Sequence, residues 1–293
     1  MDNLKSKYTH ILSDNFQNLE EIALKEKSNY LNAKPFPNIV LNNFFKDDFL
    51  TTILNDFPDL SKLSKSQSYN VKNEIKLSNK NYNEFPITIK SFINFLNSDF
   101  FLNFLQSLTS IKEKLVSDPH LEGGGLHEIK SGGVLKIHTD FNRHPFLDLD
   151  RRVNVLIYLN KNWRDSYGGC LELWDKNMNK CEKKILPYFN TMAIFSTTDF
   201  SNHGHPDPLN CPVEISRKSI ALYYFSSGRP KEEIQQIHRK NKTYFKGRAG
   251  IINDADEKKE TFKNFIRKFK FYQFLKNFEK KYIRKGKNIS KDK

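Results

Sequence analysis

The amino-acid sequence predicts a mainly β fold with flanking helices, in the α+β class. After Gly123, six short segments rich in β-branched and aromatic residues alternate with clusters of Gly, Asn, Asp and Pro, a pattern typical of a β-sandwich or β-barrel. Before Gly123, apolar residues recur mainly at helical spacings. The 293 residues give room for one large domain or two small ones.

The part of the chain before Gly123 is predicted to be mostly helical. Residues 1–34 are polar, with Leu and Ile at helical spacings, and predict an N-terminal helical segment. Residues 35–57 predict a short strand followed by a helix that begins near Asp47. Residues 86–111 predict two helices, which carry much of the high Phe content.

The part after Gly123 supplies the predicted strands. They are GLHEIK (125–130), VLKIHTD (134–140), RVNVLIYLN (152–160), GGCLELWD (168–175), TMAIFST (191–197) and SIALYYF (219–225). We therefore expect a β-rich domain at residues 35–230, with its strand core at about 120–228. A basic extension at 231–293 follows it, with a helical pattern from Thr261.

Charge and cysteine usage narrow the class of protein. The net charge is +14, and residues 258–293 hold fourteen Lys and Arg against three acidic residues. A packed helix with a solvated basic face is the favoured interpretation of this tail; contact with an anionic membrane surface or nucleic acid is the alternative. Three cysteines without CxxC spacing, and no signal-peptide or membrane-spanning apolar run, lead us to expect a soluble, cytoplasmic protein.

The stretch LKIHTDFNRH (135–144) carries the first chemical signal. Its alternation predicts a strand, on which His138 and Asp140 share one face. The two side chains either form a hydrogen-bonded pair at the end of a strand or are two ligands of a metal. His203 and His205 follow another predicted strand, and one of them could be a third ligand. Two histidines and a carboxylate with open positions form the facial triad of non-haem Fe(II) oxygenases, unlike the usual tetrahedral zinc sites.

An arginine adds the second signal. On the last predicted strand, Arg217, Ser219, Ala221 and Tyr223 share a face. If that face lines a pocket, the guanidinium needs an anion, because an unpaired buried charge is costly. Its planar fork suits a carboxylate. A surface ion pair is the alternative interpretation of Arg217.

The order HxD, His, Arg resembles that of the Fe(II)- and 2-oxoglutarate-dependent dioxygenases, and within them the prolyl 4-hydroxylase-like group. Four further segments are similar to that group: RRVNVLIYLNKNW (151–163), YGGCLELWD (167–175), SNHGHP (201–206) and RKSIALYYF (217–225). The resemblance covers about residues 120–228. It implies a double-stranded β-helix, a jelly-roll core with the iron at one open end.

The resemblance also implies roles for individual residues. His138, Asp140 and His203 would bind Fe(II), and Arg217 would pair with the remote carboxylate of 2-oxoglutarate. The family pattern, with the ligand directly before Gly, favours His203 over His205, which would then contact substrate or support the ligands. The further candidates for cosubstrate binding are Tyr158, whose hydroxyl would assist the arginine, Leu171, Ser219, Tyr223 and His127. His127 could equally be a core or surface histidine, and Tyr223 could simply be a core residue. His144 could contact substrate, but an ordinary loop histidine is the favoured interpretation.

The implied activity is hydroxylation with O₂ as oxidant and ascorbate as a possible reductant. Asp140 favours hydroxylation, because related halogenases lack that carboxylate. The expected substrate is a prolyl or other residue in a protein or peptide. The alternatives are a sugar, a lipid, another small molecule or a methylated nucleobase. A non-catalytic binding module on the same fold is disfavoured by the intact ligand set and Arg217.

Overall fold

The computed structural model describes residues 8–233 and 243–248. The first of its two compact units, Met1–Phe245, contains every helix and strand given below. The helix predicted from Thr261 and the charge of residues 258–293 lie outside the described residues, so their role stays a prediction. None of the described helices is long and apolar enough to cross a membrane.

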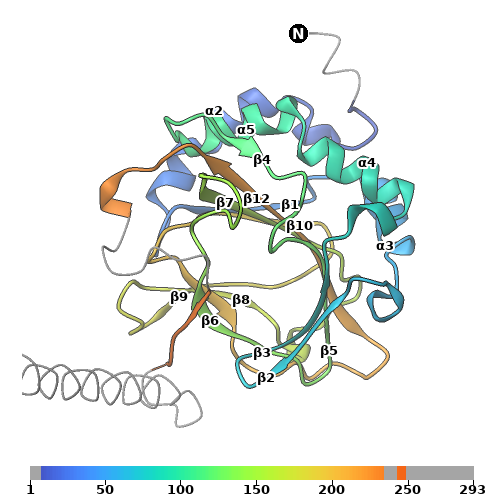
Figure 1. Cartoon of the computed structure of the whole chain (residues 1–293). Coiled ribbons are helices and arrows are strands. Elements are labelled where there is room, and N and C mark those ends of the chain that lie inside the picture. Colours follow the sequence, from blue (N-terminus) through green and yellow to red (C-terminus); the bar gives the residue numbers. More distant parts are fainter. Residues whose placement is uncertain (1–7, 234–242, 249–293) are drawn as a thin grey trace, which may run out of the picture. The chain divides into compact units, whose positions relative to one another are not determined.

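The strands of the described part form one antiparallel sheet. They are β1 (Asn38–Asn42), β2 (Gln67–Val71), β3 (Glu74–Asn79), β4 (Val116–Ser117), β5 (Gly125–Lys130), β6 (Leu135–Thr139), β7 (Asp150–Tyr158), β8 (Leu171–Trp174), β9 (Cys181–Ile185), β10 (Thr191–Ser196), β11 (Asn202–His205), β12 (Ser216–Ser226) and β13 (Tyr244–Phe245). The order across the sheet is β1-β10-β7-β12-β5-β3-β6-β11-β8-β9, and β2, β4 and β13 pair with β3, β12 and β6. The sheet curls into a nearly closed barrel (Figure 1).

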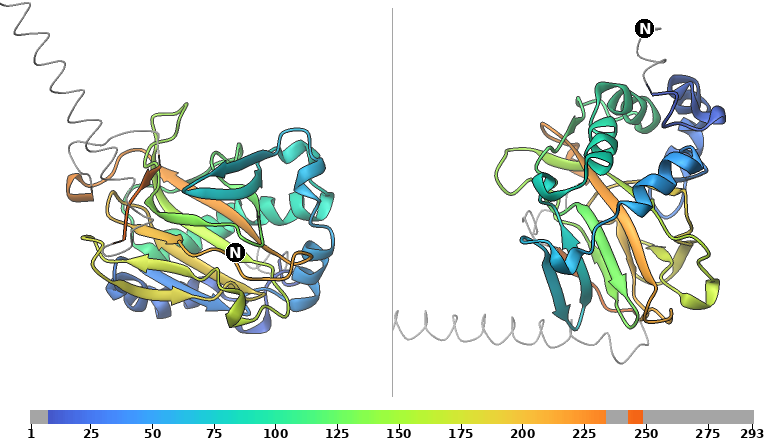
Figure 2. Two further views of the ribbon diagram at one scale, coloured as in Figure 1. Left: turned by 90° about the horizontal axis from the view of Figure 1, so that it is seen from below. Right: turned by 90° about the vertical axis from the view of Figure 1, so that its right-hand side faces the viewer.

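Helices cover one side of this barrel. The described helices are α2 (Leu19–Asn32), α3 (Asp47–Asn55), α4 (Ile87–Leu96) and α5 (Asp99–Thr109), with 3₁₀ turns η1 (Asp14–Phe16), η2 (Leu60–Lys62), η3 (Tyr82–Glu84), η4 (Asp165–Tyr167) and η5 (Lys231–Glu233). Figure 1 shows these α-helices beside β1, β10, β7 and β12, with β6, β8 and β9 on the far side. In the right panel of Figure 2 the helices again lie toward the top, above the strands.

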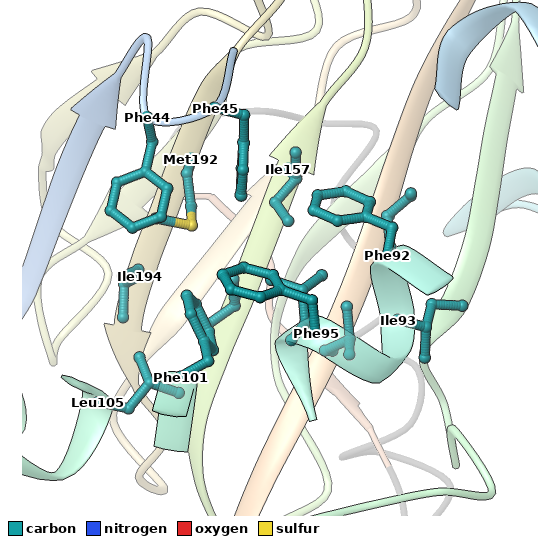
Figure 3. Packing of buried hydrophobic residues seen from close by; sticks show 14 of the residues in the cluster. Phe44, Phe45, Phe92, Ile93, Phe95, Phe101, Leu105, Ile157, Met192 and Ile194 are labelled. Carbon is teal, nitrogen blue, oxygen red and sulfur yellow. The ribbon is translucent and has the colours of Figure 1, made fainter. Parts of the chain in front are cut away.

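The main hydrophobic core lies between the helices and the outer face of the sheet. Phe92, Phe95 and Phe101 from α4 and α5 are fully buried and pack toward Ile157 of β7 and Ile194 of β10 (Figure 3). The high Phe content of the helices predicted at residues 86–111 therefore fills this layer. Because helices cover the outer face of β1, β10, β7 and β12, the inner face of these strands is the one left to line a site.

A second, smaller apolar cluster lies on the inner face. It joins Phe36, Tyr158, Leu171, Leu173, Ile185, Ala193 and Phe195. Most other inner-face positions are polar or small, which is unusual for the interior of a β-barrel of this size. The main hydrophobic core thus lies outside the barrel, and many of the side chains inside the barrel are polar.

The predicted class, mainly β with flanking helices, is confirmed, and all six predicted strands form. The β2–β3 hairpin and the short strands β4, β9, β11 and β13 were not predicted from the sequence. The sheet thus takes in β1, β2 and β3, which precede the predicted strand core, and β13, which lies in the segment assigned to the extension.

The N-terminal helix is shorter than predicted. α2 begins after Asn18, whose side chain accepts a hydrogen bond from the main-chain nitrogen of Glu21. The described residues before it form turns and η1, and the Ser13–Asp14 pair there favours turns over helix. The prediction of helix throughout residues 1–34 is therefore wrong for 8–17, and residues 1–7 lie outside the described part.

Candidate active site

Two neighbouring strands bring the predicted metal ligands together. His138 of β6 lies directly opposite His203 of β11, and Asp140 follows the end of β6. One ligand atom from each of the three lies within 4.8 Å of the others. His138 Nε2 is 3.5 Å from Asp140 Oδ1, and His203 Nε2 is 3.4 Å from Asp140 Oδ2. Among the described residues, His203 and not His205 joins this cluster.

Both histidines are oriented by the main chain. His138 Nδ1 lies 2.8 Å from the carbonyl oxygen of Lys136, and His203 Nδ1 lies 2.9 Å from that of Ser201. These contacts place the proton on Nδ1 and leave the Nε2 lone pair facing the cluster. Burial lowers the pKa of His203 to about 4, so this ring is neutral and able to bind a metal near neutral pH.

Asp140 is held by two hydrogen-bond donors. Its Oδ2 accepts from Arg151 Nη2 at 2.8 Å and from Asn154 Nδ2 at 2.7 Å. Burial alone would raise the pKa of Asp140, but the charge of the neighbouring Arg151 guanidinium holds this pKa well below its usual range. Asp140 is therefore an oriented carboxylate, with Oδ1 free of these two donors.

Arg151 was not predicted from the sequence. Its guanidinium carbon lies 4.6 Å from the ring centre of Phe141 and 3.2 Å from that of Tyr223, so it is enclosed by two aromatic rings. Simple alternation along β7 puts Asn154 inward and Arg151 outward. The register between β7 and β12 shifts between Tyr224 and Phe225, and this irregularity allows Arg151 to reach Asp140.

Arg217 lies on the inner face of β12. Its Nε donates to the carbonyl oxygen of Gly169 at 2.9 Å, and its Nη2 donates to the hydroxyl of Tyr158 at 3.2 Å. The side chain is buried, and no carboxylate of the described residues pairs with it. Gly169 has a φ of +72°, and a Cβ there would lie 3.0 Å from Arg217 Cδ. The absence of a side chain at Gly169 therefore leaves room for the Arg217 side chain.

The other predicted residues lie on the inner face as well. Ser219 and His127 face each other across β12 and β5, and Tyr223 stacks on Arg151. Leu171 belongs to the inner apolar cluster. His205 is buried two residues beyond His203 on β11.

His144 has a structural place outside the cluster. Its Nδ1 accepts hydrogen bonds from the main-chain nitrogens of Phe146 and Leu147, and its Nε2 lies 3.7 Å from Asp118. These contacts fix a turn in the loop that follows β6.

A pocket of about 280 Å³ opens beside the cluster. It is lined by Gln67, Tyr69, Lys76, Ser78 and Lys80 from the β2–β3 hairpin and its end, and by Glu122, Gly123, Gly124, Phe141 and Pro145. Phe141 follows Asp140 directly and packs against Arg151, so one side chain separates the pocket from the residue that holds Asp140. Its lysines have carboxylate partners: Lys76 pairs with Glu74 and Lys80 with Glu122.

These residues fit one divalent metal and one organic anion. Two neutral imidazoles and one carboxylate are the donor set that non-haem Fe(II) prefers. The buried Arg217 lacks a carboxylate partner among the described residues. Its planar guanidinium can donate two parallel hydrogen bonds to a carboxylate. A 2-oxo dicarboxylate could bind the metal at one end and Arg217 at the other.

Comparison with known proteins agrees with this chemistry. Residues 124–225 match the model of the 2OG-Fe(II) oxygenase superfamily. No curated protein matches the chain. A solved prolyl hydroxylase from Trichoplax adhaerens, in complex with a hypoxia inducible factor oxygen degradation domain peptide fragment, is similar over 72% of this chain and 92% of its own, with a TM-score of 0.53 and 20% identity. A prolyl 4-hydroxylase from Phytophthora capsici is similar over 73% of this chain and 66% of its own, with a TM-score of 0.50 and 18% identity.

At these identities the two structures show the fold alone, and they confirm the predicted jelly-roll core. The matched segment contains His138, Asp140, His203 and Arg217. The resemblance predicted from the sequence is thereby confirmed. Residues 124–225 thus match the 2OG-Fe(II) oxygenase superfamily, whose members are dioxygenases that use Fe(II) and 2-oxoglutarate.

Proposed function

We propose that this enzyme hydroxylates a prolyl or other residue of a protein or peptide, with Fe(II), 2-oxoglutarate and O₂. The observation that carries the proposal is the combination of the three-ligand cluster with the buried Arg217, which has no carboxylate partner among the described residues. Binding of a metal alone would leave Arg217 without a carboxylate partner. Binding of an anion alone would not explain why His138, Asp140 and His203 lie together.

The bound Fe(II) would supply the redox chemistry that couples oxidative decarboxylation of 2-oxoglutarate to insertion of oxygen into a substrate C–H bond. The chain's own residues orient the participants. His138 and His203 present neutral Nε2 atoms to the metal, and Asp140 is held by Arg151 and Asn154.

At the other end of the cosubstrate, Arg217 and Tyr158 would hold the remote carboxylate. The Tyr158 hydroxyl accepts from Arg217, so its own proton remains available for an anion. Both side chains are buried, which keeps bulk water away and strengthens these interactions. The cosubstrate would thus lie in one orientation, with its 2-oxo acid end toward the ligand cluster.

The pocket beside Phe141 supports a peptide substrate. Gln67, Tyr69, Lys76 and Ser78 line it from one face of the β2–β3 hairpin. These polar side chains can pair with the main-chain N–H and C=O groups of an extended peptide, while Phe141 offers an apolar contact for a prolyl ring. The Trichoplax adhaerens enzyme of the same fold is a prolyl hydroxylase in complex with a peptide fragment, which adds support.

Ascorbate would act only as a reductant that returns the oxidised metal to Fe(II). Its role is tested by comparing turnover numbers with and without it.

A substrate panel tests the proposal. The protein is incubated with Fe(II), 2-oxoglutarate and O₂ together with prolyl peptides, free proline, sugars, fatty acids or methylated oligonucleotides. Succinate formation and the gain of one oxygen atom in the substrate mass are measured, with Asp140→Ala as the control. We expect coupled succinate formation with peptides. Coupling with only a non-peptide class would overturn the assigned substrate and leave the reaction class in place.

A further inference from the structure

A row of polar residues crosses the inner face of the barrel next to Arg217. Ser78 lies opposite His127, His127 opposite Ser219, Ser219 opposite Tyr158, and Tyr158 opposite Thr191. Directly opposed residues of antiparallel strands point to the same side of a sheet. This polar row therefore spans five strands at the level where the Tyr158 hydroxyl contacts Arg217.

The next row toward the metal ligands is small. Gly125 lies opposite Ala221, Ala221 opposite Leu156, and Leu156 opposite Ala193. Beyond it, Asn154 lies opposite Tyr223, at the level of Asp140. Apart from Leu156, the side chains of this row are smaller than those of the polar row.

Two buried histidines, His127 of β5 and His205 of β11, have ring nitrogen atoms without a hydrogen-bond partner. Both ring nitrogens of His205 are buried without one, although the main chain of Asp207 lies near, and so is Nε2 of His127. His127 lies opposite Ser219, two residues after Arg217 on β12. His205 follows Gly204, which lies opposite Glu172 on β8, close in the chain to the Gly169 carbonyl that accepts from Arg217. Besides burial, the charges of Arg217 and Lys76 lower the pKa values of both histidines, in agreement with this placement. Lys76 already pairs with Glu74 at 2.8 Å, whereas no carboxylate of the described residues pairs with Arg217.

Buried polar groups without partners are rare in native proteins, because burial removes their hydrogen bonds to water without replacing them. Two such rings beside the same arginine indicate that a ligand, and not the protein, completes their hydrogen bonds. The ligand must accept hydrogen bonds and carry negative charge to suit Arg217. A carboxylate does both, since its two oxygens offer about four acceptor positions.

We infer that His127 and His205 donate hydrogen bonds to the remote carboxylate of the 2-oxo acid cosubstrate, beside Arg217 and Tyr158. This inference rests on the proposed function. Arg217 uses Nε for Gly169 and one Nη2 donor for Tyr158, so it cannot fill all acceptor positions of a carboxylate. The two imidazole N–H groups and the Tyr158 hydroxyl fill the rest. Selectivity for a dicarboxylic over a monocarboxylic 2-oxo acid then depends on both histidines.

The test measures ligand affinity without turnover. The full-length protein is loaded with Mn(II) in the absence of O₂, and 2-oxoglutarate or 2-oxovalerate is titrated by calorimetry. The second ligand has the same chain length but lacks the remote carboxylate. The variants are His205→Leu and His127→Leu, together with His205→Phe and His127→Phe, which keep an aromatic ring at each position. The control is His120→Leu, because His120 is exposed. Thermal unfolding without ligand is measured for each protein.

We expect each His205 and His127 variant to weaken 2-oxoglutarate binding by about tenfold or more, the effect of losing a hydrogen bond to a charged group. Affinity for 2-oxovalerate should not change, and the unliganded variants should unfold at the wild-type temperature or above it. A variant that keeps wild-type preference for 2-oxoglutarate overturns the inference, as does equal weakening for both ligands. If a Leu variant does not fold, the Phe variant decides.

Failure of the proposed function gives a different result. Wild-type protein would then not bind 2-oxoglutarate in a metal-dependent manner, whatever the variants do. If wild-type protein binds the cosubstrate and Arg217→Ala abolishes binding while the histidine variants are unchanged, the proposed function stands and only the inference on His127 and His205 falls.

Discussion

Arg151 gives the sharpest test of how the metal site is built. Replacing it with Met removes the guanidinium between Phe141 and Tyr223 and one of the two hydrogen bonds to Asp140 Oδ2. Methionine keeps an apolar side chain between the rings. The Asp140 carboxylate would then be oriented by Asn154 alone, and metal affinity should fall.

The size of the effect follows from the lost contact. A hydrogen bond from a charged donor contributes about 1.5–3 kcal/mol, which corresponds to roughly ten- to 150-fold in the metal dissociation constant. Loss of groups that orient metal ligands commonly costs about 10–100-fold. The assay is competition between the protein and a chelator for Mn(II) or Zn(II), followed from pH 5 to pH 8.

The pH dependence has a definite sign. In the wild type, Arg151 keeps the pKa of Asp140 well below its usual range, so the carboxylate stays ionised as the pH falls. Without Arg151, burial raises this pKa, and metal binding should be lost at a higher pH than in the wild type. The matched control is Arg152→Met, because Arg152 is equally buried but pairs with Glu113 and Ser226. Wild-type affinity in Arg151→Met, or equal loss in Arg152→Met, would refute this account.

Three further outcomes are expected. Arg217→Ala should weaken 2-oxoglutarate binding in calorimetry by roughly thirty- to a thousand-fold, with partial recovery in Arg217→Lys, whereas the neighbouring Lys218→Ala should not. Gly169→Ala should lower the melting temperature and also weaken 2-oxoglutarate binding, because the new Cβ would lie 2.6 Å from Leu209 Cδ2 and 3.0 Å from Arg217 Cδ. Deleting residues 258–293 should leave iron binding and basal 2-oxoglutarate decarboxylation intact in protein that stays folded; their loss would show that tail and site are coupled.

Much of the site could be predicted because it depends on local alternation. Along β12 and β7, a period of two placed Arg217, Ser219 and Tyr158 on one face, and the structure agrees through the hydrogen bond from Arg217 to Tyr158. The same rule placed both His203 and His205 inward. The register of β11 against β6 shifts between these two residues. Only one of them can lie opposite His138, and the sequence motif favoured the right one.

The missed features depend on non-local geometry or carry a weak signal. Arg151 reaches Asp140 because of an irregularity in β-pairing, which alternation does not encode. The β2–β3 hairpin was missed because the face that lines the pocket is polar, so an apolar strand pattern is weak there. The strand β11 is short and contains two histidines and a glycine. Gly204 is needed because a Cβ would lie 2.6 Å from the carbonyl oxygen of Leu135.

The central claim is that one metal and one 2-oxo dicarboxylate work together at this site. Its most direct test is succinate release from 2-oxoglutarate by purified protein, with Fe(II) and O₂ each added or withheld. The account predicts succinate formation that requires both and is abolished in His138→Ala and Arg217→Ala, while His120→Ala keeps it. Succinate formation that persists without Fe(II), or that is unchanged in both active-site variants, would contradict the account.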